Sequence, residues 1–346
     1  MFSSQAAILI PNLVNTDKFG LLSASLTAGS WSRINCAVKS VSLFASSTNS
    51  QIFWPLSSDF LGSYINWAFR LKGLRSSTIS AYISALKTIH LLKGLDSSSC
   101  NCFLVKSLIR GASNLEIYNS LARSSRKVFT LPALKILGHQ LAISDFPKDW
   151  IQVVWAACCC AFFGSLRIGE IIPLSSSGFL PQESLLWKDV SFVSKDHVIL
   201  HIKCSKARTK GGESVDLFSF PGHGCCPVKA LSLLKASHPP TLRFSSLPVF
   251  ASPSGSLLTA SQLNSIIRSL LKSHLGDDSS SFSCHSFRAA IPSLLAQHPE
   301  LASSDMIMGW GRWKSSAYLS YTRLRSSQRR KVFAKIADIL NLPRRA

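Results

Sequence analysis

His285 and Arg288 are two side chains that could act together on an anionic centre. They lie three residues apart at the start of CHSFRAAIPSLLAQ, residues 284–297, which is otherwise mostly apolar. On a helix this spacing puts both side chains on one face. An imidazole exchanges protons near neutral pH, and a guanidinium donates planar, bidentate hydrogen bonds to phosphate or carboxylate. The pair alone does not define a site, because most helical histidines are structural and HxxR is a short pattern.

Arg167 and two lysines add further cationic groups. Arg167 follows a strongly apolar segment in GSLRIGE, where an arginine is rarely buried without a reason. Glu170 comes three residues later, so an ion pair between the two is the favoured interpretation of this motif by itself. Lys206 and Lys210 lie in HIKCSKARTKGGES, near the end of a predicted strand. Lysines in such a loop are ordinarily solvated, and neither predicts a site by itself.

The segment GWGRWKSSAYLSYTR, residues 309–323, combines arginine with aromatic side chains. Arg312 and Trp313 are adjacent, and Tyr318 and Tyr321 follow them. A tyrosine hydroxyl acts as a nucleophile when a neighbouring group takes its proton. The aromatic residues fit a hydrophobic core equally well.

Helical periodicity dominates the first third of the chain. In SSDFLGSYINWAF, residues 57–69, Ser58 is the expected N-cap and Asp59 the acid of the first turn. In SSTISAYISALKTIHLL, residues 76–92, apolar residues recur at three- and four-residue steps. Basic residues flank both segments, and acids are absent between Asp59 and Asp96. The pattern predicts a helical bundle with one basic side, made by Arg70, Lys72, Arg75, Lys87 and Lys93.

The later part of the chain mixes helices with a β-rich interval. Two helices are expected in LPALKILGHQLAIS and WIQVVWAACCCAFFG. A strand is predicted in HVILHIK, because Val198, Leu200 and Ile202 alternate with the residues between them. WKDVSFVSK and SVDLFSF are the strands expected before and after it, and the Gly-Gly pair at 211–212 predicts a turn between the last two. From Leu257 onward the pattern is helical again.

These patterns divide the chain into five segments. Residues 119–129, NSLARSSRKVF, are polar and are predicted to be a linker. The last 24 residues hold eight basic residues and one acid, Asp338. The expected boundaries are an arm at 1–30, a helical domain at 31–118, the linker at 119–129, a second domain at 130–322 and a basic C-terminal segment at 323–346.

The net charge predicts a polyanionic partner. Thirty-eight Lys and Arg residues face seventeen Asp and Glu residues, which gives +21 at pH 7. Nucleic acid is the commonest polyanion that such an excess matches. A hydrophobic fraction of 46% against 16% charged residues is typical of a globular chain and not of a disordered one.

Composition argues against several other classes. No apolar run reaches the ~18 residues of a membrane span, and no basic stretch precedes the apolar N-terminal residues as in a signal peptide. The ten cysteines include no CxxC pair, and His223, Cys225 and Cys226 lack the second half of a zinc site. We therefore expect reduced thiols, no metal and an intracellular protein, nuclear if the source is eukaryotic and otherwise cytoplasmic or nucleoid-associated.

The order and separation of the motifs resemble the tyrosine recombinase family. Members of that family have a similar succession of motifs. These are an RxxE motif, a lysine in a β-hairpin, an HxxR motif, and a tyrosine shortly after a glycine-containing motif. The likeness covers most of the chain, because SSTISAYISALKTIH resembles the characteristic helix of the family's core-binding domain. HSFR with GRWKSSAYLSYTR looks most like the recombinases of eukaryotic mobile elements, the DIRS-like and Crypton groups.

The resemblance implies a mainly α fold with a small antiparallel β-sheet. It implies that residues 31–118 form a helical, SAM-like core-binding domain and residues 130–322 an α+β catalytic domain. The two would form a C-shaped clamp on double-stranded DNA. Residues 323–346 would dock on a neighbouring protomer and give a homo-oligomer, from dimer to tetramer, on DNA.

The resemblance also implies roles for individual residues. Tyr321 would attack a DNA phosphodiester, forming a 3′-phosphotyrosyl link and releasing a 5′-hydroxyl. No metal or other cofactor is implied, since arginines neutralise the charge. Lys210 rivals Lys206 as general acid, Arg312 rivals Trp313 at the family's His-or-Trp position, and Tyr318 rivals Tyr321. The implied catalytic residues are Arg167, Lys206, His285, Arg288, Trp313 and Tyr321, and the implied DNA-binding residues are Arg70, Lys72, Arg75, Lys87, Lys210 and Arg312.

The implied activity is site-specific recombination, which would serve integration or transposition of a mobile element. A type IB topoisomerase, which nicks and reseals DNA without exchanging partners, is an alternative with similar residues. A DNA-binding protein that has lost catalysis is the other alternative. The helical domain and the basic tail favour recombination, and the presence of every expected residue argues against lost catalysis.

Overall fold

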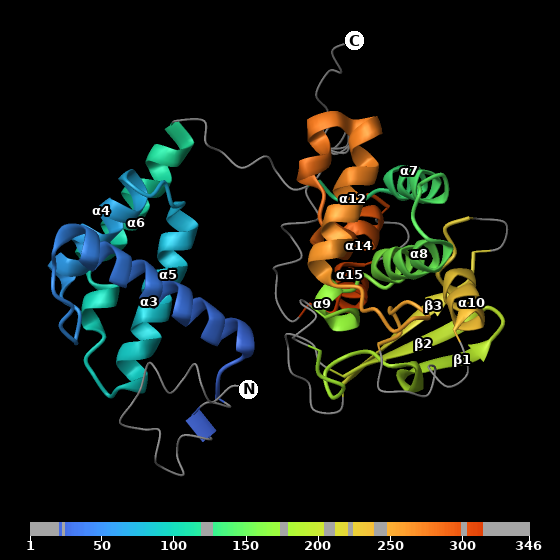
Figure 1. Ribbon diagram of the computed structural model, residues 1–346, viewed down its shortest axis with the longest axis horizontal. Helices are drawn as coiled ribbons and strands as arrows, with labels where there is room; N and C mark the ends of the chain where they lie inside the picture. The colour runs from blue at the N-terminus through green and yellow to red at the C-terminus, as the bar shows by residue number, and fades with distance from the viewer. Residues whose placement is uncertain are drawn as a thin grey trace, which may run out of the picture. The chain divides into compact units, whose positions relative to one another are not determined.

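The chain consists of two compact units, Met1–Arg123 and Ser124–Ala346 (Figure 1). The computed structural model describes residues 21–22, 25–118, 127–173, 179–203, 212–220, 224–238, 248–298 and 303–313. Each unit has its own hydrophobic core. Among the described helices, none is long and apolar enough to cross a membrane.

The first unit is a helical bundle. Its core contains an aromatic cluster in which the Phe44 ring lies 5.5 Å from Trp67 and 5.8 Å from Tyr64, centroid to centroid. Its helices are α3 (Ala28–Thr48), α4 (Ser58–Arg70), α5 (Ser76–Leu92) and α6 (Phe103–Tyr118), with the 3-10 turn η2 (Ser98–Asn101) before α6. Helix α3 packs on α5, and α4 packs on α6.

The N-cap of α4 differs from the sequence prediction, whereas α5 begins at Ser76 as its pattern indicates. Ser57, and not Ser58, is the N-cap of α4, and its hydroxyl accepts from the Phe60 N–H at 3.1 Å. Helix α5 has no side-chain N-cap of its own. Instead, Glu116 of α6 accepts from the Ser76 backbone N–H at 2.5 Å and from the Ser76 hydroxyl at 2.9 Å. A carboxylate at a helix N-terminus also interacts favourably with the positive end of the helix dipole. This long-range contact therefore replaces a local cap.

The loop before α4 is fastened to α5 by a buried histidine. His90 is 0% exposed, and its Nε2 accepts from the Leu56 backbone N–H at 2.9 Å. Because Nε2 accepts, the ring hydrogen is on Nδ1, which donates to the Leu86 carbonyl oxygen at 2.8 Å. The pair of bonds satisfies both ring nitrogens inside the core.

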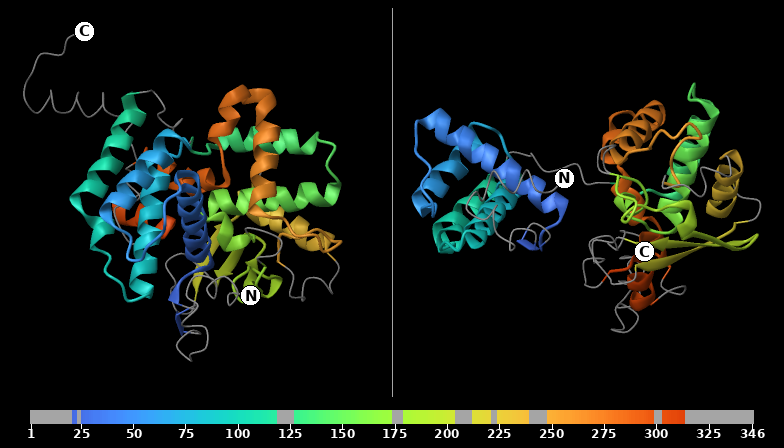
Figure 2. Two further views of the ribbon diagram at one scale, coloured as in Figure 1. Left: turned by 60° about the vertical axis from the view of Figure 1, so that its left-hand side comes forward. Right: turned by 60° about the horizontal axis from the view of Figure 1, so that its bottom comes forward.

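The second unit holds the other described helices, most of them around one core, with a smaller separate cluster around Ile307 (Figures 1 and 2). The longer helices are α7 (Leu131–Ala142), α8 (Lys148–Phe163), α10 (Pro227–Ser237) and α12 (Ala260–Leu275). The short ones are α9 (Ile168–Ile171), α13 (Cys284–Arg288), α14 (Ala290–Leu295) and α15 (Ser304–Gly311), with 3-10 turns η4 (Trp187–Asp189) and η5 (Gly276–Ser281). Helix α8 contacts α7, α10, α13 and α14, so it is central to the unit.

A small antiparallel sheet in the order β1-β2-β3 packs on these helices. Its strands are β1 (Val190–Ser194), β2 (His197–Ile202) and β3 (Glu213–Phe218). The predicted alternation in β2 is confirmed, because Val198, Leu200 and Ile202 are buried in the same core as α8 and α10. The β2–β3 register pairs Ile202 with Glu213, so Glu213 stands where the hairpin leaves the sheet.

The apolar segment 284–297 forms two short helices instead of one. Helix α13 ends at Arg288 and α14 begins at Ala290. Pro292 has no N–H to donate to the Arg288 carbonyl, four residues earlier, and its ring would clash with that oxygen. The break therefore ends α13 at the arginine itself.

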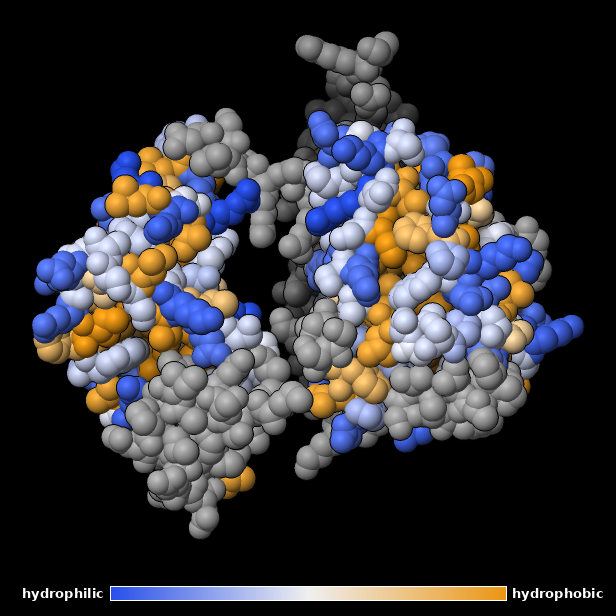
Figure 3. All heavy atoms as spheres, viewed as in Figure 1, coloured by the Kyte–Doolittle hydropathy of each residue, from blue (hydrophilic) through white to orange (hydrophobic). Residues whose placement is uncertain are grey.

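Figure 3 shows one face of the molecule, where hydrophilic side chains are interspersed with small apolar patches. In the first unit Arg70, Lys72 and Arg75 are exposed, whereas Lys87 is half-buried. Lys72 lies with its Nζ 5.3 Å from the centroid of the Trp67 ring. The ammonium group of this lysine therefore lies over the ring in a cation–π contact.

Candidate active site

Arg167 is held by a tight turn at the end of α8. A Cβ on Gly164 would lie 2.9 Å from the Cys160 carbonyl oxygen and 3.1 Å from Val215 Cγ1, so the chain passes too close to the sheet for a larger residue. Ser165 follows with φ 46°, in the left-handed region, and is fully buried. Arg167 is then the N-cap of α9. The turn fixes where the arginine leaves the core.

Glu170 binds Arg167 at two points. Its Oε1 lies 2.8 Å from Arg167 Nη1, and its Oε2 accepts from the Arg167 backbone N–H at 3.0 Å. Glu170 is 3% exposed, whereas the Arg167 side chain is 28% exposed. Burial by itself would raise the pKa of the Glu170 carboxyl, but the charge and hydrogen bonds of Arg312 and the bonds from Arg167 hold that pKa below its usual value. Glu170 is therefore an anion at neutral pH.

Arg288 lies deeper, at the end of α13, and is only 1% exposed. Its Nη1 donates to the Ser165 carbonyl oxygen at 3.0 Å, and its Nη2 donates to the Gly311 carbonyl oxygen at 2.5 Å. The guanidinium carbon lies 5.2 Å from the centroid of the Trp313 ring. Arg288 thus joins the turn before Arg167 to the end of α15. These two bonds use one hydrogen of each terminal nitrogen.

Two contacts outside the site orient α13. The Cys284 backbone N–H donates to Asn264 Oδ1 of α12 at 2.8 Å. Phe287 stacks on Phe129 with ring centroids 4.3 Å apart. His285 lies on the same helix and is exposed, in contrast to Arg288. The two residues of the HxxR motif therefore share a helix but differ in depth.

The end of α15 brings Arg312 and Trp313 to the same place. Arg312 is the C-cap, with φ 52°. Its Nη2 lies 2.6 Å from Glu170 Oε2, and its Nη1 lies 3.1 Å from Glu213 Oε2. Trp310 ties the helix to α8, since its Nε1 donates to the Phe163 carbonyl oxygen at 3.2 Å. Helices α9 and α15 and strand β3 therefore meet at Arg312.

Gly311 leaves room for the Trp313 ring. A Cβ at this position would lie 1.8 Å from Trp313 Cζ3. We expect Gly311→Ala to lower the free energy of unfolding by about 1–3 kcal/mol, the usual cost of forcing an extra methyl group into a packed site. Thermal or urea unfolding of the second unit measures it.

Gly309 provides the matched control in the same helix. A Cβ there would meet nothing within 4 Å. Gly309→Ala should leave stability unchanged or raise it by about 0.5–1 kcal/mol, because alanine is the better helix former. Equal destabilisation by both substitutions would contradict the contact between Gly311 and the indole.

The structure brings together only part of the predicted site. Arg167, Arg288, Arg312 and Trp313 belong to one connected set, and His285 lies on the helix that ends at Arg288. Outside the described residues lie Lys206, Lys210, Tyr318 and Tyr321. The predicted DNA-binding residues Arg70, Lys72, Arg75 and Lys87 belong to the other unit.

The sequence analysis missed three partners in this set. Glu213 and the carbonyls of Ser165 and Gly311 were not predicted, and no motif singles them out. Glu213 could have been suspected only from its place at the start of a strand next to two glycines. Among the described residues no cluster of His, Cys, Asp or Glu could hold a metal ion.

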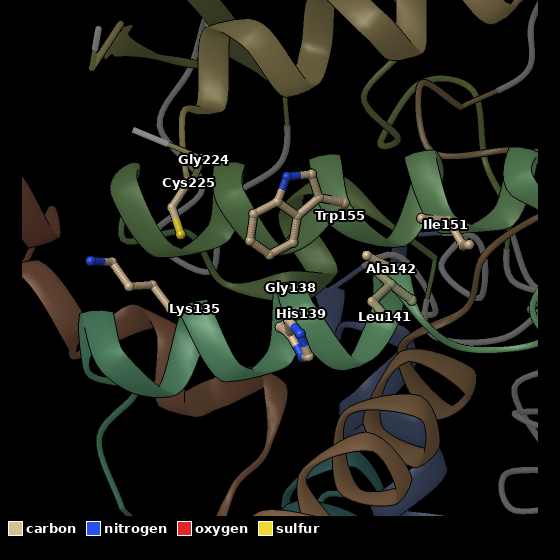
Figure 4. A pocket seen from close by; sticks show the side chains of 9 residues that line it. All are labelled: Lys135, Gly138, His139, Leu141, Ala142, Ile151, Trp155, Gly224 and Cys225. Atoms are coloured by element: carbon tan, nitrogen blue, oxygen red, sulfur yellow. The ribbon is translucent and has the colours of Figure 1, made fainter. Parts of the chain in front are cut away.

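A separate pocket of about 490 Å³ lies between α7 and α8 (Figure 4). The Trp155 indole lies against Gly138, where a Cβ would come within 2.6 Å of the ring. Lys135, His139 and Cys225 are its polar lining residues, and none of them belongs to the set around Arg288.

Solved structures of similar fold identify the architecture. The integrase of transposon Tn1549, in complex with transposon right-end DNA, is similar over 97% of this chain and 99% of its own, with a TM-score of 0.56 and 12% sequence identity. The XerH site-specific recombinase, bound to palindromic difH substrate in a post-cleavage complex, is similar over 96% of this chain and 88% of its own, with a TM-score of 0.58 and 13% identity. No protein-family model and no curated protein matches the sequence.

These likenesses confirm the predicted fold class. The chain has the tyrosine recombinase fold, which is mainly helical with a small antiparallel sheet.

Proposed function

We propose, from the tyrosine recombinase fold of this chain and the arginines held within it, that the protein is a site-specific DNA recombinase of a mobile element. It would cut and rejoin DNA strands through a 3′-phosphotyrosyl intermediate. The observation that carries the proposal is the bond from Arg288 to the Ser165 carbonyl oxygen at 3.0 Å, two residues before Arg167. It holds two arginines, 121 residues apart in the sequence, near one point of the fold.

The proposed reaction is an exchange of phosphoesters. The oxygen of Tyr321 forms a bond to a DNA phosphorus, and the bond from that phosphorus to the 5′-oxygen breaks. A 5′-hydroxyl of a second strand then attacks the phosphotyrosine and releases the tyrosine. The number of phosphoester bonds is unchanged, so the reaction needs no external energy source. Tyr321 lies outside the described residues.

The arginines would act on the pentavalent transition state. Its non-bridging oxygens carry more negative charge than those of the diester, and a guanidinium offers two parallel N–H donors to such a group. Arg288 is preorganised by two backbone carbonyls and by Trp313. Because its orientation is already fixed, little rearrangement is needed when charge develops.

Proton transfer would fall to His285 and to a lysine that lies between β2 and β3 in the sequence. The exposed His285 would take the tyrosine proton or hold the phosphate. Lys206 or Lys210 would give a proton to the departing 5′-oxygen. Both lysines follow β2 in the sequence, outside the described residues.

DNA binding is supported by the charge of +21 and by the exposed basic residues of the first unit. The similar integrase of transposon Tn1549 is in complex with transposon right-end DNA, and the similar XerH recombinase is bound to difH substrate. We propose that the protein belongs to a mobile element because the motifs in residues 284–288 and 309–323 resemble those of recombinases from eukaryotic mobile elements. We also propose that the C-terminal segment 323–346 docks on a neighbouring protomer and that the protein assembles on two DNA sites.

The salt dependence of DNA binding tests the basic side of the first unit. The triple variant with Arg70→Gln, Lys72→Gln and Arg75→Gln should make the slope of log K against log salt shallower by roughly 3, since each phosphate contact contributes about 0.9. Fluorescence anisotropy with a labelled duplex at several salt concentrations measures it. The matched triple is Lys188→Gln, Lys195→Gln and Lys229→Gln, all exposed in the second unit. An equal change in both triples would refute the assignment of the first three residues.

Capture of a covalent adduct tests the function without knowledge of the target site. The full chain is incubated with a pool of randomised duplexes, each with a nick that lets the short fragment with the new 5′-hydroxyl diffuse away after cleavage. DNA that remains bound to protein after denaturation is sequenced. Recovery of a defined sequence, joined to protein through a 3′-phosphate, supports recombinase chemistry. DNA binding without any adduct would favour a catalytically silent protein.

The same captured sequence separates recombination from nicking and resealing. Intact duplexes of this sequence, which lose no fragment after cleavage, are incubated with the protein and with a second duplex that has a free 5′-hydroxyl. Transfer of the strand to that duplex is the result expected of a recombinase. Resealing of the original strand alone would favour the topoisomerase-like alternative.

A further inference from the structure

We infer that Arg312 is a positioning residue, which acts through Glu170 and Glu213 and not on DNA itself. The inference rests on the proposed function and assigns to Arg312 the task of holding Arg167 and the β2–β3 hairpin in register. It differs from the sequence expectation, which placed Arg312 among the DNA-binding residues.

The first support is the way in which Glu170 is shared. Its Oε2 accepts from Arg312 Nη2 at 2.6 Å and from the Arg167 backbone N–H at 3.0 Å, while its Oε1 binds Arg167 Nη1 at 2.8 Å. Both guanidiniums therefore orient the same buried carboxylate. Without Arg312, Arg167 would be the only one of these two cations bound to Glu170. Glu170 would then be held less firmly, and so would Arg167, which binds it.

The second support is the position of Glu213. It is the first residue of β3 and pairs in the ladder with Ile202, the last residue of β2. Arg312 Nη1 contacts Glu213 Oε2 at 3.1 Å. The ion pair therefore holds the first residue of β3, and Lys206 and Lys210 lie between β2 and β3 in the sequence. A proton donor must be placed precisely for its chemical step, so we infer that this ion pair serves the placement of the donor.

The third support is charge and burial. The side chains of Arg312, Glu213 and Glu170 are 12%, 19% and 3% exposed. Two carboxylates balance the charges of Arg167 and Arg312, so Arg312 presents little net charge to a phosphate. Its Nε is buried and has no hydrogen-bond partner among the described residues.

The test compares two substrates that differ in the leaving group. The ordinary captured DNA requires a proton on the departing 5′-oxygen, whereas a substrate with bridging sulfur at that position releases a thiolate, which needs none. In both, the tyrosine oxygen bonds to phosphorus and the electron pair of the broken bond goes to the leaving atom. The sulfur substrate therefore hides defects in the proton donor and leaves other defects visible.

Glu213→Gln removes one ion pair and keeps the shape of the side chain. We expect adduct formation about 10- to 100-fold slower than wild type on ordinary DNA, a part of what a positioned general acid contributes. On the sulfur substrate the rate should return to that of wild type. The DNA dissociation constant should be unchanged.

Arg312→Ala removes both ion pairs, so its defect should persist on the sulfur substrate, on the order of 100-fold. Arg312→Lys should be intermediate, because one ammonium cannot bridge two carboxylates as a planar guanidinium does. The control is Asp278→Asn, which breaks the exposed pair of Asp278 with Lys127 in the same unit and should change neither rate. Thermal unfolding of each variant shows whether it is folded at the assay temperature.

Three results would overturn the inference. Glu213→Gln could react like wild type on ordinary DNA, or be slowed equally on both substrates, which indicates general disruption. Arg312→Ala could weaken DNA binding and flatten its salt slope by about 1, as loss of a phosphate contact does. If wild type itself forms no adduct, the proposed function fails, and the inference fails with it.

Discussion

Arg288→Ala should lower the rate of covalent adduct formation by about 100- to 1000-fold or more while the DNA dissociation constant changes little. This is the usual cost of removing one preorganised donor from a developing oxyanion. DNA affinity comes from many phosphate contacts, so one buried arginine contributes little to it. Single-turnover adduct formation and anisotropy on the same captured duplex measure the two quantities.

Two further variants separate catalysis from folding. Arg288 also satisfies the carbonyls of Ser165 and Gly311, and an unsatisfied buried carbonyl costs about 1–3 kcal/mol, so Arg288→Ala should also unfold at a lower temperature. Arg167→Ala should show the same loss of rate with a smaller loss of stability, since its side chain is 28% exposed. The matched control is Arg268→Ala, which also loses a bond to a backbone carbonyl, from Nε to Phe282 at 3.1 Å, and should keep its rate. Equal loss of affinity and rate in both site variants would count against the assigned role.

The helices and strands were predictable where the pattern is local. The alternation of Val198, Leu200 and Ile202 is set by the two-residue period of a strand, and burial follows it. The contact that satisfies the N-terminus of α5 was not predictable, because Glu116 contacts Ser76 across 40 residues of sequence. The break after Arg288 could have been read from Pro292, since a proline removes a helical hydrogen bond four residues back.

The residue types of the candidate site were predictable, but the contacts between its side chains were not. Arg167 and Arg288 stand out because a cation next to an apolar segment is uncommon. The sequence left Arg312 and Trp313 as rivals for one role. In the structure they have different partners: Trp313 packs on the Arg288 guanidinium, and Arg312 pairs with Glu170 and Glu213.

The contacts of Arg312 could not be predicted, because an ion pair between residues far apart in the sequence leaves no local pattern. Glu213 is 99 residues from Arg312, and Glu170 is 142 residues from it. An acid at the start of a strand is ordinarily solvated, so only the fold shows that this one is 19% exposed and paired.

Tyr321→Phe should abolish adduct formation completely, whereas Tyr318→Phe should leave it near the level of the unmodified chain. A phenyl ring has no oxygen to join to phosphorus, so no other group can rescue the step at that position. The two tyrosines are three residues apart, a spacing that would put both on one face of a helix. Mass spectrometry of the digested adduct identifies the tyrosine that carries the nucleotide.

The comparison of the two variants also separates loss of the nucleophile from loss of binding. Both substitutions remove one hydroxyl and keep the ring, so DNA affinity and unfolding temperature should agree between them. Loss of the adduct in Tyr318→Phe alone would move the nucleophile by three residues and would leave the roles of Arg167 and Arg288 intact. Full adduct yield in both variants would show that no tyrosine of this pair attacks the phosphate. Because the proposed role of Arg167 and Arg288 does not depend on which oxygen attacks, that result would contradict the phosphotyrosyl intermediate at residues 309–323 and not the proposed role of the arginines.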